Sequence, residues 1–357
     1  MRDPLRLVFT TPSVYGETAV INRRILLARR PDGAPVPEDF RTVEEPPPVP
    51  KAGEVLLRTL YLSLDPYMRG RMSDAPSYAE PVALGAVMCG QTVSRVVQSN
   101  DAKFKTGDLV LANGGWQDYV AESARTLTTL DASMPRPSYA LGLLGMPGLT
   151  AYVGLLDIGQ PKAGETVVVT AATGAVGSVV GQIAKLKGCR AVGVAGGAEK
   201  CAFAVATLGY DACIDHRAPD FPRLLANACP KGIDVYFESV GGAVTTAAWP
   251  LLNAHARVPL CGLVAYYSLK GLPAGPDHTP VVMRQILVKR LKVQGFIIFD
   301  HFDRHAQFLR DMSGWLGQGK LQYREEVLEG LERAPGGLIG MLRGDNFGKL
   351  VVKVADG

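Results

Sequence analysis

Two patterns of hydrophobic and polar positions divide the chain. Up to residue 123 the apolar residues form short runs rich in Val, Leu and Tyr, and Gly, Asn or Asp separates each run from the next. Such spacing is typical of the strands of an antiparallel, barrel-like domain. From Val167 onward, apolar runs alternate with helical patterns, which predicts a parallel sheet with helices on both faces. We therefore expect an α/β protein of two domains, the first of them mostly β.

The predicted elements follow from these runs. In the first part, strands are expected at Asn22–Ala28, from Glu54 to the turn at Asp65-Pro66, and at Val87–Ser99, Gly107–Asn113 and Gly115–Ser123. In the second part, strands are expected at Val167–Thr170, Ala191–Ala195, Ala212–Asp215, Val235–Glu238 and Arg257–Leu263, a helix and a strand within Val281–Ile298, and a helix at Arg304–Gly317. Gly348–Val354 is predicted to be a strand that rejoins the first domain.

The segments between these runs receive less definite interpretations. Arg29–Phe40 and the proline-rich Glu44–Pro50 are expected to be extended connectors, because consecutive prolines favour polyproline geometry. Residues 1–20 show no periodicity. We interpret them as an N-terminal arm without an assigned function.

The stretch Val167–Gly188 is a strand, a glycine-containing turn and a helix in direct succession. A helix that begins at such a turn offers free N–H groups and a partial positive charge to a diphosphate, and glycine lets the backbone approach it. Gly174 and Gly177 match the second and third glycines of the dinucleotide fingerprint G-x-G-x-x-G, whereas Ala172 stands in place of the first. The stretch predicts a pyrophosphate site, and a glycine-rich turn of another α/β protein is the less favoured alternative.

Composition and charge narrow the class of protein. The 357 residues are 47% hydrophobic and 20% charged, as in ordinary globular proteins, and the length suits two domains. A formal charge of +4 without a basic block argues against a nucleic-acid partner. The six scattered cysteines form no disulfide or metal framework, and no secretory signal is apparent. We expect a cytoplasmic protein without a membrane partner.

The end of the second strand of the α/β part indicates which dinucleotide binds. An acid there would hydrogen-bond the free ribose 2′-hydroxyl of NAD, but the chain has Gly196 and Gly197, followed by Lys200. The glycines are expected to leave room and free N–H groups for an oxyanion, and Lys200 supplies a cation for the 2′-phosphate of NADP. His216, after the third strand, is a further candidate for this phosphate. NADP(H) is the expected cofactor, while Glu199 keeps NAD(H) and a solvated surface lysine open.

Candidate chemistry rests on tyrosines rather than on a metal. The cysteines do not cluster and all five histidines lie in the second half of the chain, so no zinc site of the alcohol dehydrogenase kind is expected. A tyrosine hydroxyl, with a pKa of about 10, can donate a hydrogen bond to a carbonyl that becomes an enolate. Tyr266 and Tyr267 follow a strand at the carboxyl edge of the predicted sheet, and Tyr67 lies in the turn after Pro66. From the residues alone, tyrosines at a domain surface are an equally good interpretation.

Several further motifs, in order along the chain, carry a resemblance to a known family. They are LSLDPYMRGRMSD (Leu62–Asp74), GMPGLTAYVGLLDIGQPK (Gly145–Lys162), AATGAVGSVVGQIAKLKGC (Ala171–Cys189), GVAGGAEKC (Gly193–Cys201), VGG (Val240–Gly242), PLCGLVAYYS (Pro259–Ser268), LPAGP (Leu272–Pro276) and GDNFGK (Gly344–Lys349). The chain resembles the zinc-independent medium-chain dehydrogenase/reductases of the leukotriene B4 dehydrogenase and prostaglandin reductase family, and within it the bacterial NADPH-dependent curcumin reductases. The resemblance covers nearly all of Asn22–Ala355.

The resemblance implies a fold and a set of site residues. The fold is a Rossmann-type doubly wound parallel sheet at 139–303 and a GroES-like, mostly antiparallel β-barrel domain at 21–138 and 304–357. The implied cofactor contacts are Pro147, Thr150, Thr173, Gly174, Ala175, Val176, Gly177, Gly196, Lys200, His216, Ser239, Cys261, Gly262, Leu263, Tyr267, Phe296, Ile297, Ile298 and Asn346. Tyr267 is the implied catalytic residue, and Tyr67 and Tyr266 are assigned to the substrate. His216 and Ser239 stand where relatives often have tyrosine and asparagine.

The function that the resemblance implies is NADPH-dependent reduction of the C=C bond of α,β-unsaturated ketones and aldehydes. Hydride would go to the β-carbon and a proton to the α-carbon, in an apolar cleft closed by the loop Lys270–Pro280. A quinone or carbonyl reductase on the same scaffold, and an NADPH-binding protein without turnover, stay open as alternatives. Relatives are commonly dimers, so a homodimer is expected.

Overall fold

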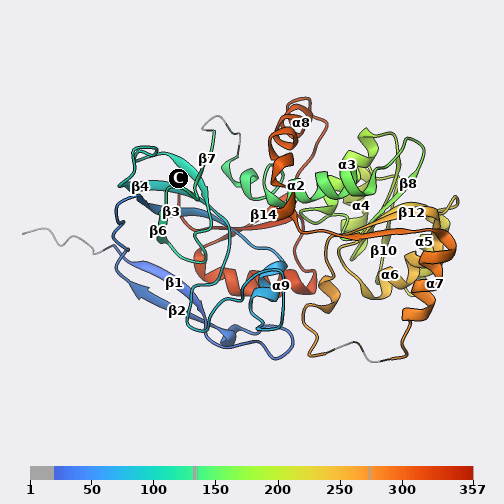
Figure 1. Ribbon diagram of the computed structural model, residues 1–357, viewed down its shortest axis with the longest axis horizontal. Coiled ribbons are helices and arrows are strands. Elements are labelled where there is room, and N and C mark those ends of the chain that lie inside the picture. The colour runs from blue at the N-terminus through green and yellow to red at the C-terminus, as the bar shows by residue number, and fades with distance from the viewer. Residues whose placement is uncertain (1–19, 132–133, 135, 272, 274, 357) are drawn as a thin grey trace, which may run out of the picture.

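The computed structural model describes residues 20–131, 134, 136–271, 273 and 275–356 (Figure 1). Apart from Val20, the predicted arm lies outside the described residues. A β-rich domain and an α/β domain stand side by side (Figure 1). After the α/β domain the chain returns, and the late strands β14 (Glu325–Glu329) and β15 (Lys349–Lys353) belong to the sheet of the first domain. The predicted α/β architecture of two domains is confirmed.

The first domain is built on a seven-stranded sheet. In spatial order its strands are β14, β15, β3 (Glu54–Ser63), β4 (Thr92–Ser99), β5 (Leu109–Ala112) and β7 (Thr128–Thr129), and β6 (Tyr119–Ser123) also pairs with β3. All of these pairs are antiparallel except the pair of β14 with β15. The end of the chain therefore rejoins the first domain through β15, as the sequence predicts.

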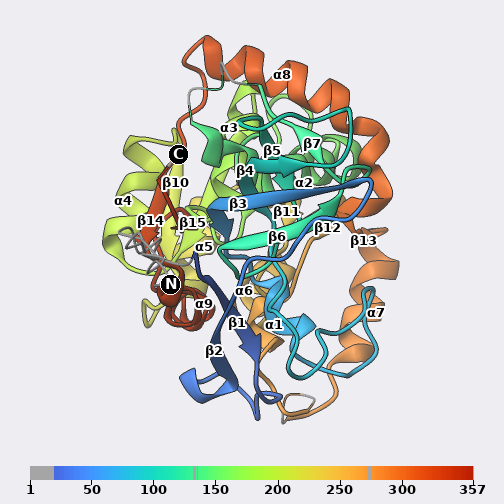
Figure 2. The same ribbon diagram turned by 90° about the vertical axis from the view of Figure 1, so that its left-hand side faces the viewer.

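A separate two-stranded sheet corrects part of the expected connectors. β1 (Asn22–Leu27) pairs along its whole length with β2 (Phe40–Glu45), and the pair extends below the larger sheet in Figure 2. Phe40 stacks on Trp116 with ring centroids 5.5 Å apart, and Arg24 pairs with the Glu45 carboxylate. Trp116 lies far from β2 in the sequence, and Arg24 lies on the paired strand β1. The local pattern of β2 therefore did not reveal that it is a strand.

The second domain contains a six-stranded sheet in which all pairs are parallel. Its order is β10 (Ala212–Asp215), β9 (Arg190–Ala195), β8 (Thr166–Val169), β11 (Ile233–Phe237), β12 (Leu252–Leu260) and β13 (Lys292–Gly295). Counted along the chain this is the strand order 3-2-1-4-5-6 of the dinucleotide-binding fold. β12 begins at Leu252 rather than at Arg257, because the polar Asn253 and His255 hide a strand whose Leu252 and Ala256 are buried.

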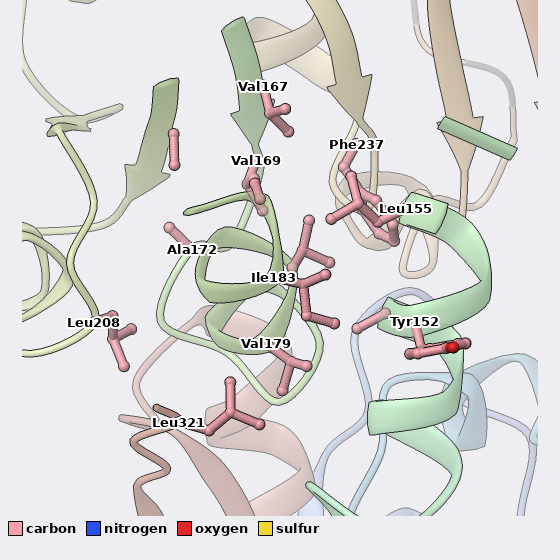
Figure 3. Packing of buried hydrophobic residues seen from close by; sticks show 14 of the residues in the cluster. Tyr152, Leu155, Val167, Val169, Ala172, Val179, Ile183, Leu208, Phe237 and Leu321 are labelled. Atoms are coloured by element: carbon pink, nitrogen blue, oxygen red, sulfur yellow. The ribbon is translucent and has the colours of Figure 1, made fainter. Parts of the chain in front are cut away.

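Helices cover both faces of this sheet, which makes it doubly wound as expected. Along β8, Val167 and Val169 pack into one hydrophobic cluster with α2 (Met146–Val153) and α3 (Gly177–Leu186), and Figure 3 shows this packing. Val168 points to the other face, where α5 (Phe221–Ala228) and α6 (Gly242–Ala248) close a second cluster. A strand buried on both faces explains the uncharged, β-branched run of the sequence.

The other helices lie at the ends and edges of the two sheets. They are α1 (Tyr67–Arg71), α4 (Ala198–Ala206), α7 (Thr279–Lys289), α8 (His305–Gly317) and α9 (Ala334–Arg343). Short 3₁₀ segments occupy Pro37–Asp39, Pro137–Leu141, Trp249–Leu251, Val264–Tyr266, Ile298–Arg304 and Leu331–Arg333, and Gly154–Gly159 is π-helical.

α8 packs against the α/β domain rather than against the barrel. Phe308 and Met312 are buried in the cluster that contains Val167, and the Tyr152 hydroxyl donates to the Asp311 carboxylate at 2.5 Å. The domain boundary at residue 304 stays a prediction. The packing of α8 favours a crossing to the first domain after the helix.

Candidate functional site

A cavity of about 800 Å³ lies between the two domains. Residues that follow each of the six parallel strands line it, as expected for a ligand crevice at the carboxyl edge of such a sheet. The predicted site residues found there are Tyr67, Pro147, Thr150, Thr173, Gly174, Ala175, Val176, Gly177, Gly196, Lys200, His216, Ser239, Cys261, Gly262, Tyr267, Phe296, Ile297, Ile298 and Asn346. Leu263 and Tyr266 are not among the lining residues.

The turn between β8 and α3 is narrow because small residues fill it. A Cβ atom on Gly177 would lie 2.3 Å from the Ala171 carbonyl oxygen, so only glycine fits where α3 begins. Ala172, in the place of the first fingerprint glycine, is buried, and a Cβ atom on Gly193 of β9 would approach its methyl group to 2.7 Å. Glycine on the neighbouring strand therefore makes room for the alanine in the turn.

Basic side chains gather where β9 and β10 end. Lys200, His216 and Arg217 line the cavity next to Gly196. A Cβ atom on Gly196 would lie 3.0 Å from His216 Nε2 and 3.2 Å from Arg217 Cζ, so glycine keeps the space between them open. Arg217 was not predicted as a site residue, although it directly follows His216.

Lys200 and Arg217, rather than His216, supply the positive charge at this end. Burial, followed by the charge of Arg217, lowers the pKa of His216, which favours the neutral imidazole. Burial and the same guanidinium also lower the pKa of Lys200. A phosphate placed between these groups would oppose both shifts, because its negative charge favours their protonated forms.

The prediction that Gly197 offers a free N–H is wrong. The Gly197 N–H donates to Asp215 Oδ1 at 2.9 Å, and the Arg217 N–H donates to the same oxygen at 2.9 Å. Asp215, the last residue of β10, thereby joins the turn after β9 to the turn after β10. Glu199 is exposed on α4 and does not line the cavity.

The C-terminal segment closes the basic end of the cavity from the first domain. Lys200 Nζ donates to the Gly344 carbonyl oxygen at 2.7 Å, and the Phe203 ring of α4 meets Phe347 edge to face at 5.0 Å. Asn346 lines the cavity between these two contacts along the chain, and its side-chain amide donates within its own loop. Both domains therefore build this end of the cavity.

A half-buried tyrosine marks the opposite end of the cavity. The Tyr267 hydroxyl lies beside Gly262, where a Cβ atom would be 3.0 Å from it. Burial raises the pKa of Tyr267, and a hydrogen bond from the backbone of Leu263 offsets only part of the rise. Burial also raises the pKa of the Cys261 thiol to about 12, although Ser239 is hydrogen-bonded to it. At neutral pH this end therefore presents an uncharged hydroxyl and an uncharged thiol.

Tyr266 does not line the cavity, so the geometry gives no support to its predicted substrate role, which stays a prediction. Its hydroxyl accepts a hydrogen bond of 2.9 Å from the Gly242 N–H at the start of α6, and the residue is 38% exposed. It satisfies an unpaired donor of a helix end instead of facing a ligand. The Leu263 side chain packs toward Gly241 of the same turn, 3.3 Å from a Cβ atom placed there.

The first domain contributes the turn that presents Tyr67. Lys349 of β15 is buried, and its ammonium donates to Ser63 Oγ at 2.7 Å, to the Leu64 carbonyl at 2.8 Å and to Asp65 Oδ1 at 2.7 Å. These three bonds fix the turn that precedes α1. Burial raises the pKa of Tyr67 well above its ordinary value, so its phenol is neutral in the cavity wall.

Several lining residues of the first domain were not predicted. Arg71, Tyr78, Cys89 and Asn113 line the cavity opposite the parallel sheet. Arg71 stands in the motif that carried the family resemblance, whereas Tyr78 lies in an irregular segment without any sequence signal.

The loop Lys270–Pro280 does not close the cavity in its described part. None of its described residues lines the cavity, and Lys270 instead pairs with Asp32 of the first domain at 2.6 Å. Within the described chain, no group of three or more His, Cys, Asp or Glu side chains could hold a metal ion. No helix of that part is long and apolar enough to cross a membrane.

Known proteins are similar to this chain in fold and in sequence. Residues 23–130 match the family model "N-terminal domain of oxidoreductase", and residues 175–313 match "Zinc-binding dehydrogenase". NADPH-dependent curcumin reductase of Escherichia coli (strain K12) is 58% identical over 95% of this chain and 99% of that protein. Prostaglandin reductase 1 of Bos taurus is 42% identical over 90% and 95%. The crystal structure of CurA from Vibrio vulnificus in complex with NADPH superposes with a TM-score of 0.92, at 57% identity, over 94% and 100%.

The fold and the cavity define a dinucleotide-dependent oxidoreductase of two domains. With relatives of this identity along nearly its whole length, the assignment can be finer. The chain belongs to the zinc-independent medium-chain dehydrogenase/reductases of the leukotriene B4 dehydrogenase and prostaglandin reductase family, which confirms the resemblance seen in the motifs.

The basic end of the cavity predicts how the chain distinguishes the two dinucleotides. Replacing either cation, in Lys200→Ala or in Arg217→Gln, removes a charged partner of the 2′-phosphate, so the Kd for NADP⁺ should rise about 10-fold or more while that for NAD⁺ changes little. Calorimetric titration measures both constants. The exposed Glu199→Gln serves as the matched control on the same helix, with a change of less than about 2-fold. If the parent and both cation variants bind NADP⁺ with equal affinity, the 2′-phosphate does not bind at this end of the cavity.

Proposed function

We propose that the chain reduces the C=C bond of α,β-unsaturated ketones and aldehydes with NADPH. The observation that carries the proposal is the continuity of one cavity. It joins the fingerprint turn at Gly174–Gly177 and the cations Lys200 and Arg217 to the neutral hydroxyls of Tyr267 and Tyr67. The relatives named as a curcumin reductase and a prostaglandin reductase support the same class of reaction.

The residues of the cavity fit NADPH from end to end. Lys200 and Arg217 would hold the 2′-phosphate, and the start of α3 would hold the pyrophosphate. Phe296 and Ile298 on one side and Cys261 on the other would border the nicotinamide. When bound, NADPH supplies the hydride that the β-carbon of the substrate receives.

Tyr267 would act on the substrate oxygen. As the β-carbon is reduced, the carbonyl oxygen gains the charge of an enolate, and a neutral hydroxyl can donate a hydrogen bond to it. Burial keeps the Tyr267 hydroxyl protonated, because it raises its pKa. The α-carbon then takes its proton from solvent or from the same hydroxyl, which solvent reprotonates. The chain's contribution is orientation and charge stabilisation.

The wall opposite the parallel sheet would hold the conjugated part of the substrate. Tyr67 and Tyr78 of the first domain face this part of the cavity together with Met146 and Ile297 of the second. Flat aromatic and aliphatic side chains suit extended, conjugated enones, and they exclude water from the reacting centre. Phenyl-substituted enones such as curcumin are the substrates that we expect to fit best.

The two alternatives share the cofactor residues of this proposal. A quinone or carbonyl reductase would differ only in the substrate pocket, and a binding protein without turnover would keep the whole cofactor site. The half-buried, protonated Tyr267 beside Gly262 favours a reaction that develops charge on an oxygen. A protonated Tyr267 therefore argues against a binding protein without turnover. It discriminates less well between an enone reductase and a carbonyl reductase, because both reactions develop charge on an oxygen.

One substrate panel distinguishes the three functions. NADPH oxidation is followed with trans-2-alkenals, with curcumin and simpler phenyl enones, with quinones and with saturated aldehydes. The enone reductase is expected to consume the first two groups and to leave saturated aldehydes untouched. Consumption of quinones or saturated aldehydes alone would overturn the proposal, and the absence of any turnover would favour the binding protein.

The role of Tyr267 predicts both the size and the pH dependence of a variant's defect. Tyr267→Phe removes one donor to the enolate oxygen, so kcat should fall about 10- to 100-fold with little change in the Kd of NADPH. Because the pKa of Tyr267 is raised, the donor stays protonated and the parent's kcat should not decline from its ionisation between about pH 6 and about pH 9. Stopped-flow measurement of hydride transfer tests both. Full activity of Tyr267→Phe would show that the hydroxyl is only structural.

We infer that two copies of the chain associate through the free edge of the parallel sheet. β13 ends the sheet order, and α7 beside it lies at the end of the molecule far from the first domain (Figure 1). Large apolar side chains are exposed there: Val281, Met283, Leu287 and Val288 of α7 and Val293 of β13. An unpaired strand edge with exposed apolar residues favours association with a second, identical edge.

A charge on this edge should separate the copies. The chain of 38.1 kDa is expected to elute as a dimer of about twice that mass in light scattering, and Val293→Lys should give a monomer. Val49→Lys, which alters an exposed valine of the first domain, is the matched control and should stay a dimer. A monomeric parent chain would refute the proposed dimer.

A further inference from the structure

Arg71 is a cation in the cavity wall that the proposed reaction does not use. It is the last residue of α1, and it lines the cavity together with Tyr67, Tyr78 and Cys89. The basic cluster around Lys200 and Arg217 lies where β9 and β10 end, whereas Arg71 belongs to the first domain. The cavity therefore contains a positive group on its substrate side in addition to those expected for a cofactor phosphate.

The guanidinium of Arg71 has no partner among the described residues. Its Nε is shut off from solvent without a hydrogen-bond acceptor, and none of its side-chain nitrogens takes part in a hydrogen bond or an ion pair there. Arg69, two residues earlier, also has an unpaired Nε, but its Nη2 donates to the Gly33 carbonyl oxygen at 2.7 Å, so its guanidinium is held by the protein. Arg71 is half-buried, and a charge partly withdrawn from water without a counter-charge is unfavourable, so a ligand that brings a negative charge stabilises the site.

The carboxylate of Asp65, in the turn before α1, already has partners. Asp65 Oδ1 accepts from the buried ammonium of Lys349 at 2.7 Å, and its other oxygen accepts from the Ser63 hydroxyl. This pairing neutralises the charge of Lys349, which also lines the cavity. Arg343 of α9 is a further lining cation, but it directly precedes Gly344, whose carbonyl accepts from Lys200 at the basic end. Among the described residues, Arg71 is left as the unpaired cation beside Tyr67 and Tyr78.

The field of Arg71 reaches the neighbouring side chains of the substrate wall. Burial raises the pKa of Tyr78 and of Cys89, and in both cases the positive charge of Arg71 opposes the rise. Tyr78 also interacts electrostatically with Cys261 and with Tyr267. Arg71, Tyr78 and Tyr267 all line the same cavity, so the guanidinium adjoins the wall that is expected to hold the substrate.

We propose that Arg71 is an anion-binding subsite of the substrate cavity, and that the chain prefers enones that carry a carboxylate at the end remote from the carbonyl. The proposal rests on the proposed function, because it assigns the substrate class of the same cavity. A guanidinium binds a carboxylate through two parallel, charge-assisted hydrogen bonds. A neutral enone of the same shape would leave the guanidinium without its counter-charge.

A matched pair of substrates tests the subsite. 4-Phenyl-3-buten-2-one and its derivative with a carboxylate para to the enone differ only in the anionic group. The parent chain should reduce the carboxylate with the higher kcat/KM, and Arg71→Gln should lower that value about 10- to 100-fold while changing the neutral enone less than about 3-fold. Arg71→Lys should retain part of the preference, because it keeps the charge without the planar fork.

Two controls keep the result specific. Arg125→Gln removes a positive charge from an exposed site outside the cavity and should leave the preference intact. The Kd of NADPH for Arg71→Gln should equal that of the parent chain, because the cofactor cations stand elsewhere in the cavity. Loss of turnover of both enones together with loss of NADPH binding would indicate a folding defect in Arg71→Gln. In that case the parent chain decides: equal kcat/KM of the parent for the two enones would overturn the proposal.

Binding of the saturated carboxylate product separates this inference from the proposed function. Its Kd for the NADP⁺ complex is measured by calorimetry, and Arg71→Gln should raise it about 10-fold or more. If neither enone is turned over but this difference is found, the proposed reaction fails and the anion subsite stands. If both enones are reduced with equal efficiency by the parent chain and by Arg71→Gln, the reaction stands and the anion subsite is refuted.

Discussion

The buried ammonium of Lys349 holds together the parts of the chain on which the cavity depends. It bonds Ser63, Leu64 and Asp65 at the end of β3, so the returning strand β15 and the turn before Tyr67 form one unit. Removing one partner of such a buried pair typically costs about 3–5 kcal/mol, because the other charge is left without compensation. The loop that leads into β15 touches α4 of the other domain, so the same segment also closes the basic end of the cavity.

The distribution of charge along the cavity follows from this arrangement. Where β9 and β10 end, Lys200 and Arg217 offer positive charge. The Asp215 carboxylate accepts the N–H groups of Gly197 and Arg217 and so holds the two turns around these cations. Beside β12, Tyr267 and Cys261 are protonated and neutral, because burial raises the pKa of each. A dianionic phosphate at one end and a carbonyl that becomes an enolate at the other are matched by these two environments.

The sequence allowed the fold and most of the cavity to be predicted because their signals are local. The turn at Gly174–Gly177 and the alternation of strands and helices depend on residues close together in the chain. What was missed or wrong depends on tertiary contacts. Gly193 of β9 makes the room that Ala172 needs in place of the fingerprint glycine, and this contact exists only when the strands lie side by side. The pairing of β2 with β1 likewise depends on residues far apart in the chain. Tyr266 and its neighbour Tyr267 look alike in sequence. In the structure the Tyr266 hydroxyl accepts from the start of α6, whereas Tyr267 lines the cavity.

The central claim, hydride delivery to the β-carbon of an enone, is tested most directly by isotope placement. NADPH deuterated at both C4 positions is turned over with 4-phenyl-3-buten-2-one in ordinary water, and the product is analysed by NMR. The account predicts a saturated ketone with a single deuterium on the β-carbon and only hydrogen from water on the α-carbon. Deuterium on the carbonyl carbon of an allylic alcohol would contradict it and would make the chain a carbonyl reductase.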